Sequence, residues 1–237
     1  MLRECRAALI DAGETLIETK YSFYELLKKR GGNFSNLQNF INIDDIILRK
    51  LQASALKNNY EIWTDDKRID EELHDFYAEA LLSTGAEDIN TLAQYLVLEM
   101  KKAENWKLIN GGAELLETLL NQQMIIGMIS NWGVSLPEII KQHRVLTKIH
   151  FHVCSSLVGC SKPSLEIFDI ALSRIRQHDH SIYSQDVVMI GDSYICDIEP
   201  ALSINMKAIW ISKKHKDRLP NMLTASCLEQ AAEALSK

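Results

Sequence analysis

The sequence has little of several features that mark special classes of protein. Only 4 of its 237 residues are proline and 10 are glycine, which excludes a collagen-like chain or a Gly/Pro-rich linker. Hydrophobic residues make up 46% and charged residues 24%, a balance that excludes intrinsic disorder. Basic residues number 26 against 32 acidic ones, a net charge of −6, which disfavours nucleic acid as a partner. An ordinary globular protein is expected.

The sequence also lacks the marks of secretion and of membrane insertion. Its 5 cysteines are odd in number and include no CxxC pair, so a reducing compartment is favoured over a disulfide framework. The apolar run from Ala7 stops at Asp11, too short for a secretory signal. The longest uncharged stretch, 118–137, contains polar side chains such as Asn121 and Ser130, so it is no membrane span. We therefore expect a cytoplasmic protein without a membrane partner; no signal for oligomeric state is present.

Most of the chain alternates short apolar runs with amphipathic stretches. This alternation is typical of βαβ units and a parallel sheet. Strands are predicted at 7–10, 124–129, 150–155, 187–190 and 208–211, and helices at 113–121, 136–142, 164–177, 195–203 and 227–236. The predicted fold class is therefore α/β, with a doubly wound parallel-sheet, Rossmann-like core formed by residues 1–19 and 106–237.

Residues 20–105 have a different pattern and predict an inserted all-helical cap domain. Apolar residues recur there at helical spacing, as at Leu73, Tyr77 and Ala80. Helices are predicted at 21–30, 37–58, 66–83 and 89–104. The aromatic residues Tyr60, Trp63 and Tyr77 could shape a substrate pocket, but aromatic side chains at helical spacing are more typical of a bundle core.

Polar side chains follow the predicted strands where ligands bind in an open parallel sheet, at the carboxyl ends. Asp11 follows the first strand, and Ser130 and Asn131 follow the second. The remaining members of the set are Lys162 before a predicted helix, and Asp192 and Asp197 after the strand at 187–190. Carboxylates at adjacent strand ends suit Mg²⁺, and a hydroxyl, backbone N–H groups and a lysine suit a phosphoryl group.

Four motifs in this order resemble the haloacid dehalogenase-like hydrolase superfamily. The first reads Asp11-Ala-Gly-Glu-Thr-Leu16, the second is Ser130-Asn131, and the third is Lys162-Pro163. The fourth reads Gly191-Asp-Ser-Tyr-Ile-Cys-Asp197. The resemblance covers essentially the whole chain, and each motif lies at a predicted strand end or helix start.

The resemblance implies a Mg²⁺-dependent phosphatase that acts on a small phosphorylated metabolite through an aspartyl phosphate. Asp11 would be the nucleophile and a metal ligand. The other implied metal ligands are the Gly13 carbonyl, Asp192 and Asp197, and the implied substrate-binding residues are Ser130, Asn131, Lys162 and Thr15.

The first motif departs from the family pattern at Gly13, where family phosphatases carry a second aspartate that protonates the leaving group. Losing a general acid costs roughly 10²–10⁴-fold in rate. Three alternatives therefore stay open: a catalytically impaired protein that binds a phosphorylated ligand or partner, a phosphonatase, and a dehalogenase. Glu14 is a further candidate, as a displaced acid.

One strand carries a second possible metal site. His150, His152 and Cys154 share a face by alternation, which suits zinc. No fourth ligand stands at a suitable spacing, so an ordinary strand is the favoured interpretation.

Overall fold

Six parallel strands form the sheet at the centre of the structure. The computed structural model describes residues 2–31, 43, 44, 46, 47, 49, 60–214 and 219–236. The strands are β1 (Ala7–Ile10), β4 (Ile125–Ser130), β5 (Phe151–Cys154), β6 (Val187–Gly191), β7 (Lys207–Ile211) and β8 (Met222–Ala225). Their spatial order is β5-β4-β1-β6-β7-β8, so the chain reverses direction across the sheet between β1 and β6. Ligands bind at such a switch point in open α/β sheets.

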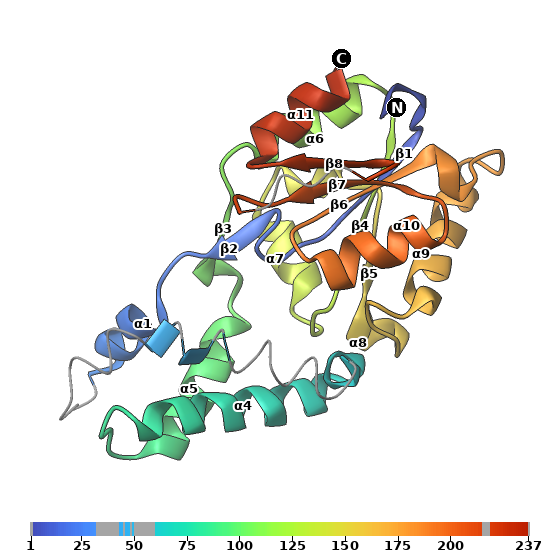
Figure 1. The fold of residues 1–237 in the computed structure, drawn as a ribbon. Coiled ribbons are helices and arrows are strands. Elements are labelled where there is room, and N and C mark those ends of the chain that lie inside the picture. The colour runs from blue at the N-terminus through green and yellow to red at the C-terminus, as the bar shows by residue number, and fades with distance from the viewer. Residues whose placement is uncertain are drawn as a thin grey trace.

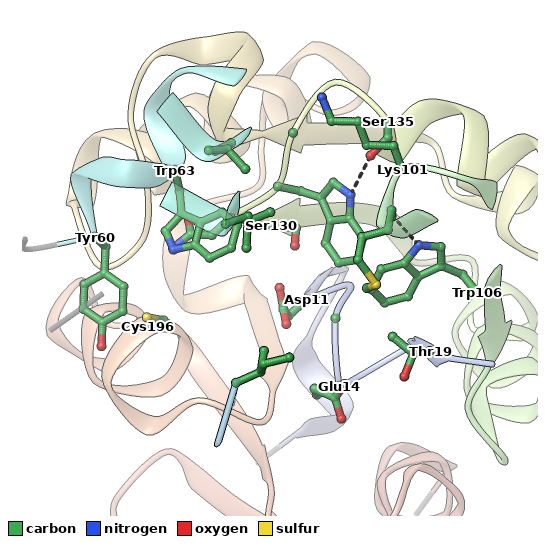
Figure 2. A pocket seen from close by; sticks show the side chains of 18 of the residues that line it. Asp11, Glu14, Thr19, Tyr60, Trp63, Lys101, Trp106, Ser130, Ser135 and Cys196 are labelled. Atoms are coloured by element: carbon green, nitrogen blue, oxygen red, sulfur yellow. Dashed lines mark hydrogen bonds between the residues drawn. The ribbon is translucent and has the colours of Figure 1, made fainter. Parts of the chain in front are cut away.

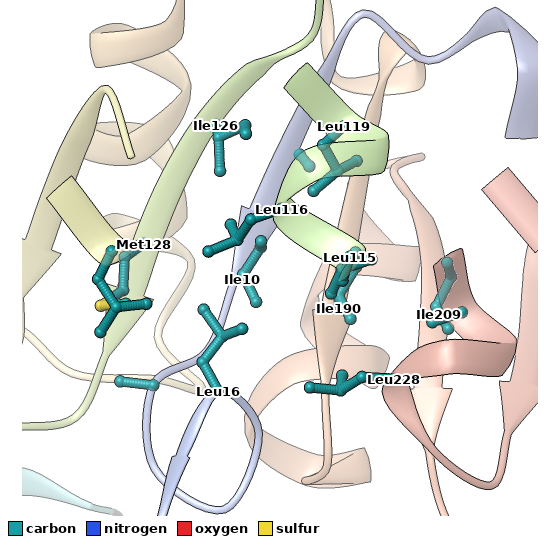
Figure 3. Close-up of a cluster of buried hydrophobic side chains, with 14 of the residues drawn as sticks. Ile10, Leu16, Leu115, Leu116, Leu119, Ile126, Met128, Ile190, Ile209 and Leu228 are labelled. Atoms are coloured by element: carbon teal, nitrogen blue, oxygen red, sulfur yellow. The ribbon is translucent and has the colours of Figure 1, made fainter. Parts of the chain in front are cut away.

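Helices cover both faces of this sheet (Figure 1). They are α6 (Gly112–Asn121), α7 (Leu136–Gln142), α9 (Leu165–His178), α10 (Glu199–Ser203) and α11 (Leu228–Ser236), whereas the short helix α8 (Ser155–Val158) lies at the carboxyl end of β5. Residues of β1 alternate between the two faces: Ile10 packs with Leu115 and Leu119 of α6, whereas Leu9 packs with Phe168 of α9. Figure 3 shows the first of these clusters. The predicted α/β fold class is confirmed.

A separate group of helices lies beyond one end of the sheet (Figure 1). It contains α1 (Phe23–Arg30), the 3-10 turn η2 (Glu61–Thr64), α4 (Asp66–Leu82) and α5 (Ile89–Met100). Its own apolar core includes Leu27, Tyr77 and Leu96. The chain enters through β2 (Ile17–Thr19) and returns through β3 (Trp106–Leu108), which pair antiparallel. The division into two domains at residues 19/20 and 105/106 stays a prediction.

Several elements differ from the sequence-based expectation. Strands β2, β3 and β8 were not predicted, because runs of three or four residues are too short for a periodic signal. The predicted helix at 195–203 is a π-helical turn, η6 (Tyr194–Ile198), followed by α10. The predicted helix at 37–58 falls largely outside the described residues. Within the described ranges, no helix is long and apolar enough to cross a membrane.

Three short 3-10 turns flank the strands of the sheet and a fourth precedes β3. They are η1 (Leu2–Glu4), η4 (Leu146–Lys148), η5 (Ser184–Asp186) and η3 (Ala103–Asn105). The helix predicted at 89–104 is shorter than expected: α5 ends at Met100, and η3 stands where its final turn was predicted.

Candidate active site

The carboxyl edge of the sheet brings the predicted site residues together. Asp11 follows β1 directly, Ser130 is the last residue of β4, and Asp192 follows β6. Because β1 lies between β4 and β6, these three side chains start from adjacent strand ends. Figure 2 shows Asp11 and Ser130 facing the same cavity. The site therefore lies at the switch point of the sheet.

Lys162 is the centre of a buried charge cluster. Its Nζ donates to Asp11 Oδ1 and to Asp197 Oδ1, each at 2.6 Å. The lysine side chain is 3% exposed, and those of Asp11 and Asp197 are 10% and 0% exposed. Ligand oxygens of Asp11, Asp192 and Asp197 lie within 4.8 Å of one another. One cation thus faces three carboxylates in a place with little water.

Burial first, and then the neighbouring negative charges, set the pKa values of this cluster. Burial, and then the neighbouring Asp11 and Asp197, raise the pKa of Asp192 to about 7. Burial also raises the pKa of Asp197 to about 6, although Lys162 opposes the shift. For Lys162 itself, burial favours the neutral form, but the two aspartates raise its pKa well above the ordinary value. The lysine therefore stays charged, and the acids compete for protons.

Asp197 is fixed by the backbone beneath it. The π-helical turn η6 buries its side chain, and Oδ2 accepts a hydrogen bond of 3.0 Å from the backbone N–H of Ser193. A Cβ at Gly191 would lie 2.3 Å from the same Oδ2, so only glycine permits this close approach. Both carboxylate oxygens of Asp197 are engaged, one by the Ser193 amide and the other by Lys162.

Asn131 and Thr15 contact other site residues. The Asn131 side chain accepts from the backbone N–H of Lys162 and donates to its carbonyl, both at 2.8 Å, which locks two loops together. The buried Thr15 hydroxyl lies 3.1 Å from Asp192 Oδ1 and 3.5 Å from Asp11 Oδ2. Asn131 thus fixes the backbone of Lys162, and Thr15 contacts the carboxylates of Asp11 and Asp192. The substrate-binding roles assigned to Asn131 and Thr15 stay predictions.

Trp132 covers the position where the family acid is missing. A Cβ built at Gly13 would lie 3.0 Å from Cζ3 of the Trp132 indole. The indole Nε1 donates to Ser135 Oγ at 3.1 Å, and the ring packs edge-on against Trp106 with centroids 4.6 Å apart. Trp132 therefore fills space that a carboxylate at position 13 would need. Sequence reasoning missed this residue, because no motif marks it.

Glu14 does not fill the role of the missing acid in this conformation. Its backbone is left-handed, with φ at 56°, and its side chain points away from Asp11 in Figure 2. Desolvation, and then the charges of Glu18 and Asp11, raise the pKa of its carboxyl. Glu14 lines the cavity but is not directed at the Asp11 carboxylate.

The alternative metal site on β5 is not formed. In the described part of the chain, the group of Asp11, Asp192 and Asp197 is the one set of His, Cys, Asp or Glu side chains close enough to share a metal ion. Nδ1 of His150 accepts from the backbone N–H of Ile126, and the Cys154 thiol donates to the Trp132 carbonyl. An ordinary strand, as favoured, accounts for these residues.

A cavity of about 660 Å³ opens above the carboxylate cluster and extends to the helical segment. Tyr60 and Trp63 line it, and Figure 2 shows both side chains beside the site. The favoured interpretation of Tyr60 and Trp63 as bundle-core residues was therefore wrong. The bundle-core interpretation is confirmed for Tyr77, which is 2% exposed and packs against Phe23, although its ring also borders the cavity.

Comparisons with known proteins identify relatives of this chain. A family model described as haloacid dehalogenase-like hydrolase matches residues 38–211. The chain is 30% identical over 155 residues to haloacid dehalogenase-like hydrolase domain-containing protein 3 of Xenopus laevis. That match covers 64% of this chain and 62% of the relative, so the chain spans about three fifths of the relative's length.

Two solved structures have a similar fold over nearly the whole chain. One is a putative hydrolase from Bacillus subtilis bound to magnesium, with a TM-score of 0.73, 19% identity, and coverage of 98% of this chain and 99% of that one. The other is L-2-haloacid dehalogenase from Xanthobacter autotrophicus with chloropropionic acid covalently bound, with a TM-score of 0.69, 11% identity and coverage of 98% of both chains. At these identities the likeness shows the fold alone.

Proposed function

The chain belongs to the haloacid dehalogenase-like hydrolase family, and on that premise we propose that it is a Mg²⁺-dependent phosphatase with Asp11 as its nucleophile. The substrate would be a small phosphorylated metabolite. The observation that carries the proposal is the cluster in which Lys162 bridges Asp11 and Asp197 beside Asp192, at the floor of the cavity.

The donor set of this cluster fits a divalent cation. Three carboxylates against one lysine leave excess negative charge, and burial together with this charge raises the pKa values of Asp192 and Asp197. Mg²⁺ prefers a few carboxylate oxygens together with water and substrate oxygens. Asp11 and Asp192 would hold the ion, with the Gly13 carbonyl as a third ligand. When bound, Mg²⁺ would offset charge on the phosphoryl oxygens.

Asp197 has a different role in this proposal. Because its oxygens already accept from Lys162 and from the Ser193 amide, it would fix the lysine and the water shell of the ion. Lys162 would then neutralise charge that develops beside Asp11. Asn131 holds the lysine backbone, and so sets where that positive charge lies.

The reaction would proceed in two displacements at phosphorus. A carboxylate oxygen of Asp11 attacks, the bond from phosphorus to the leaving oxygen breaks, and that oxygen departs with the electron pair. Water then attacks the phosphorus of the aspartyl phosphate, which releases inorganic phosphate and restores Asp11. Ser130, 2% exposed at the end of β4, would donate to a phosphoryl oxygen.

Phosphate release from acetyl phosphate tests the proposal, because its carboxylate leaves without protonation. We expect Mg²⁺-dependent release that Asp11→Asn lowers by at least about 10³-fold. Asp75→Asn is the matched control, since its side chain on α4 is 84% exposed. No release by the wild type with Mg²⁺ would rule the phosphatase out.

The absence of an acid at Gly13, reinforced by Trp132, supports two other candidate functions. A protein that only binds a phosphorylated ligand would bind acetyl phosphate without turnover. In a dehalogenase, a carboxylate oxygen of Asp11 would displace halide from C2 of a 2-haloacid without metal. Water would then hydrolyse the resulting aspartyl ester, releasing the hydroxy acid and restoring Asp11. Parallel assays with acetyl phosphate and with a 2-haloacid, each with and without Mg²⁺, separate these cases by phosphate and halide release.

A further inference from the structure

The cavity above the site has one catalytic end and an otherwise largely apolar wall. From the helical segment, Ile69, Leu73, Val97 and Met100 face it, and together with Trp63, Trp106 and Trp132 they surround the space above Asp11. At about 660 Å³, this space exceeds what a phosphoryl group needs. An apolar wall of this size suits the organic part of a substrate and not its phosphate.

Two aromatic side chains of this wall, Trp106 and Trp132, are held in place by their own contacts. Trp106 packs against Trp132, and its Nε1 donates to the Met100 carbonyl at 2.9 Å. The backbone N–H of Trp132 donates to Ser155 Oγ at 3.0 Å, and the same hydroxyl donates to the Trp63 carbonyl at 2.5 Å. Ser155 therefore ties the backbones of Trp63 and Trp132 together, and the indoles of Trp106 and Trp132 lose little rotational freedom when a flat ring binds against them.

Acidic side chains lie beside this apolar wall, on the same helix as Ile69 and Leu73. Asp66 and Asp70 of α4 both border the cavity and share one cation, Lys101, at 3.3 and 2.6 Å. Two carboxylates against one lysine leave a local negative charge. A substrate with a second anionic group beyond its phosphate would face this charge and bind less well.

The lack of a proton donor also favours an aromatic leaving group. An aliphatic alkoxide is a poor leaving group unless it is protonated, and no acid stands at Gly13 to do so. An aryl oxide, of which the tyrosine side chain with a pKa of ~10 is the model, departs far more readily. Catalytic need and cavity shape thus select the same chemistry.

We infer that the substrate is a phosphate monoester of an uncharged phenol, whose ring binds between Trp63 and the Trp106–Trp132 pair. This inference rests on the proposed phosphatase function and specifies its substrate class. Asp11 displaces the aryl oxide from phosphorus, the aryl oxide takes a proton from water after it leaves, and water cleaves the aspartyl phosphate.

A series of phosphate esters tests the wild-type protein with Mg²⁺. Phenyl and 1-naphthyl phosphate have leaving groups of similar acidity but different ring area, so the larger ring should lower KM by about tenfold at similar kcat. Butyl phosphate should react at least ~10²-fold more slowly than phenyl phosphate. A naphthyl ester that also carries a carboxylate should have a higher KM than 1-naphthyl phosphate.

Variants at Trp63 connect the effect to the cavity. Trp63→Ala should lower the ratio of kcat/KM for 1-naphthyl phosphate over acetyl phosphate by about tenfold, and Trp63→Phe should restore most of it. The control is Tyr183→Ala, because that side chain is 60% exposed and does not border the cavity. Far-UV circular dichroism of each variant checks that the fold is kept.

The outcomes separate this inference from the proposed function. If acetyl phosphate is hydrolysed in an Asp11-dependent way but butyl and 1-naphthyl phosphate have equal kcat/KM, the aromatic substrate class is wrong and the phosphatase stands. The substrate class is equally wrong if Trp63→Ala leaves the substrate ratio unchanged. If acetyl phosphate is not hydrolysed at all, the proposed function fails first.

Discussion

Among the residues that the structure describes, two lysines each bridge two aspartates, in different surroundings. At the sheet edge, Lys162 joins Asp11 and Asp197, and all three side chains are at most 10% exposed. In the helical segment, Lys101 joins Asp66 and Asp70, and these side chains are 27–35% exposed. The residue types and the short distances are alike, so burial is the main difference between the two bridges.

Burial changes what such a bridge can do. The buried cluster includes a third carboxylate, Asp192, with its pKa raised to about 7, and it opens on the cavity. Charges that water does not screen are the ones that stabilise reacting groups. The outer bridge fastens α4 to the core instead, since Asp66 Oδ1 also accepts from the backbone N–H of Val134 at 2.7 Å. One bridge is suited to chemistry and the other to position.

Removing the buried lysine should have the largest effect. Lys162→Met leaves Asp11 and Asp197 buried without their cation, so the free energy of unfolding should fall by roughly 3–5 kcal/mol. Urea unfolding at pH 8 measures it, with the exposed Lys148→Met as control. A loss below about 1 kcal/mol would show that the two lysine bridges do not differ as described.

The missing acid can be restored only together with a change at Trp132. Gly13→Asp alone should not raise hydrolysis of butyl phosphate, because the new side chain meets the indole at 3.0 Å. Gly13→Asp combined with Trp132→Ala should raise it by about 10–10²-fold over Trp132→Ala alone, as an added general acid would. An equal gain from Gly13→Asp by itself would show that the indole does not block this position.

Metal binding should be stronger at high pH, because the carboxylates of the cluster are then deprotonated. The pKa of Asp192 is about 7 in the folded protein against a reference of 3.8, so the folded state binds more protons between about pH 4 and 7. Stability without metal should therefore fall as pH rises through that window. Mg²⁺ competes with these protons, so millimolar Mg²⁺ should raise Tm by about 3–8 °C at pH 8 and by less at pH 5.

Asp192→Asn is the control for the metal effect, because it removes a proposed ligand while keeping the size of the side chain. The variant should lose most of the Tm shift at pH 8. A shift of the same size in Asp192→Asn, or one that is larger at pH 5, would place the ion elsewhere.

The outer lysine should matter least. Lys101→Met removes a cation that water partly replaces, so the free energy of unfolding should change by about 0–1 kcal/mol. Urea unfolding beside Lys162→Met gives the comparison directly. Equal losses in the two variants would mean that burial does not separate the two bridges.

The residues at the strand ends could be predicted from the sequence, and those whose effect depends on tertiary packing could not. Asp11, Ser130 and Asp192 were predictable because strand patterns locate the sheet edge, and parallel strands bring their carboxyl ends together. Trp132 was not, because its effect depends on where its indole lies relative to Gly13, far away in the sequence. For Trp63 the pocket was only the less favoured alternative, since helical spacing does not tell a core from a cavity wall.

The central claim is that Asp11 attacks phosphorus and carries the phosphoryl group. Acid quenching during turnover of acetyl phosphate with Mg²⁺, followed by peptide mass spectrometry, tests it most directly. We predict a mass increase of one phosphoryl group on the peptide that contains Asp11, lost in Asp11→Asn and kept in Asp75→Asn. A phosphoryl group on any other residue, or its persistence in Asp11→Asn, would contradict the account.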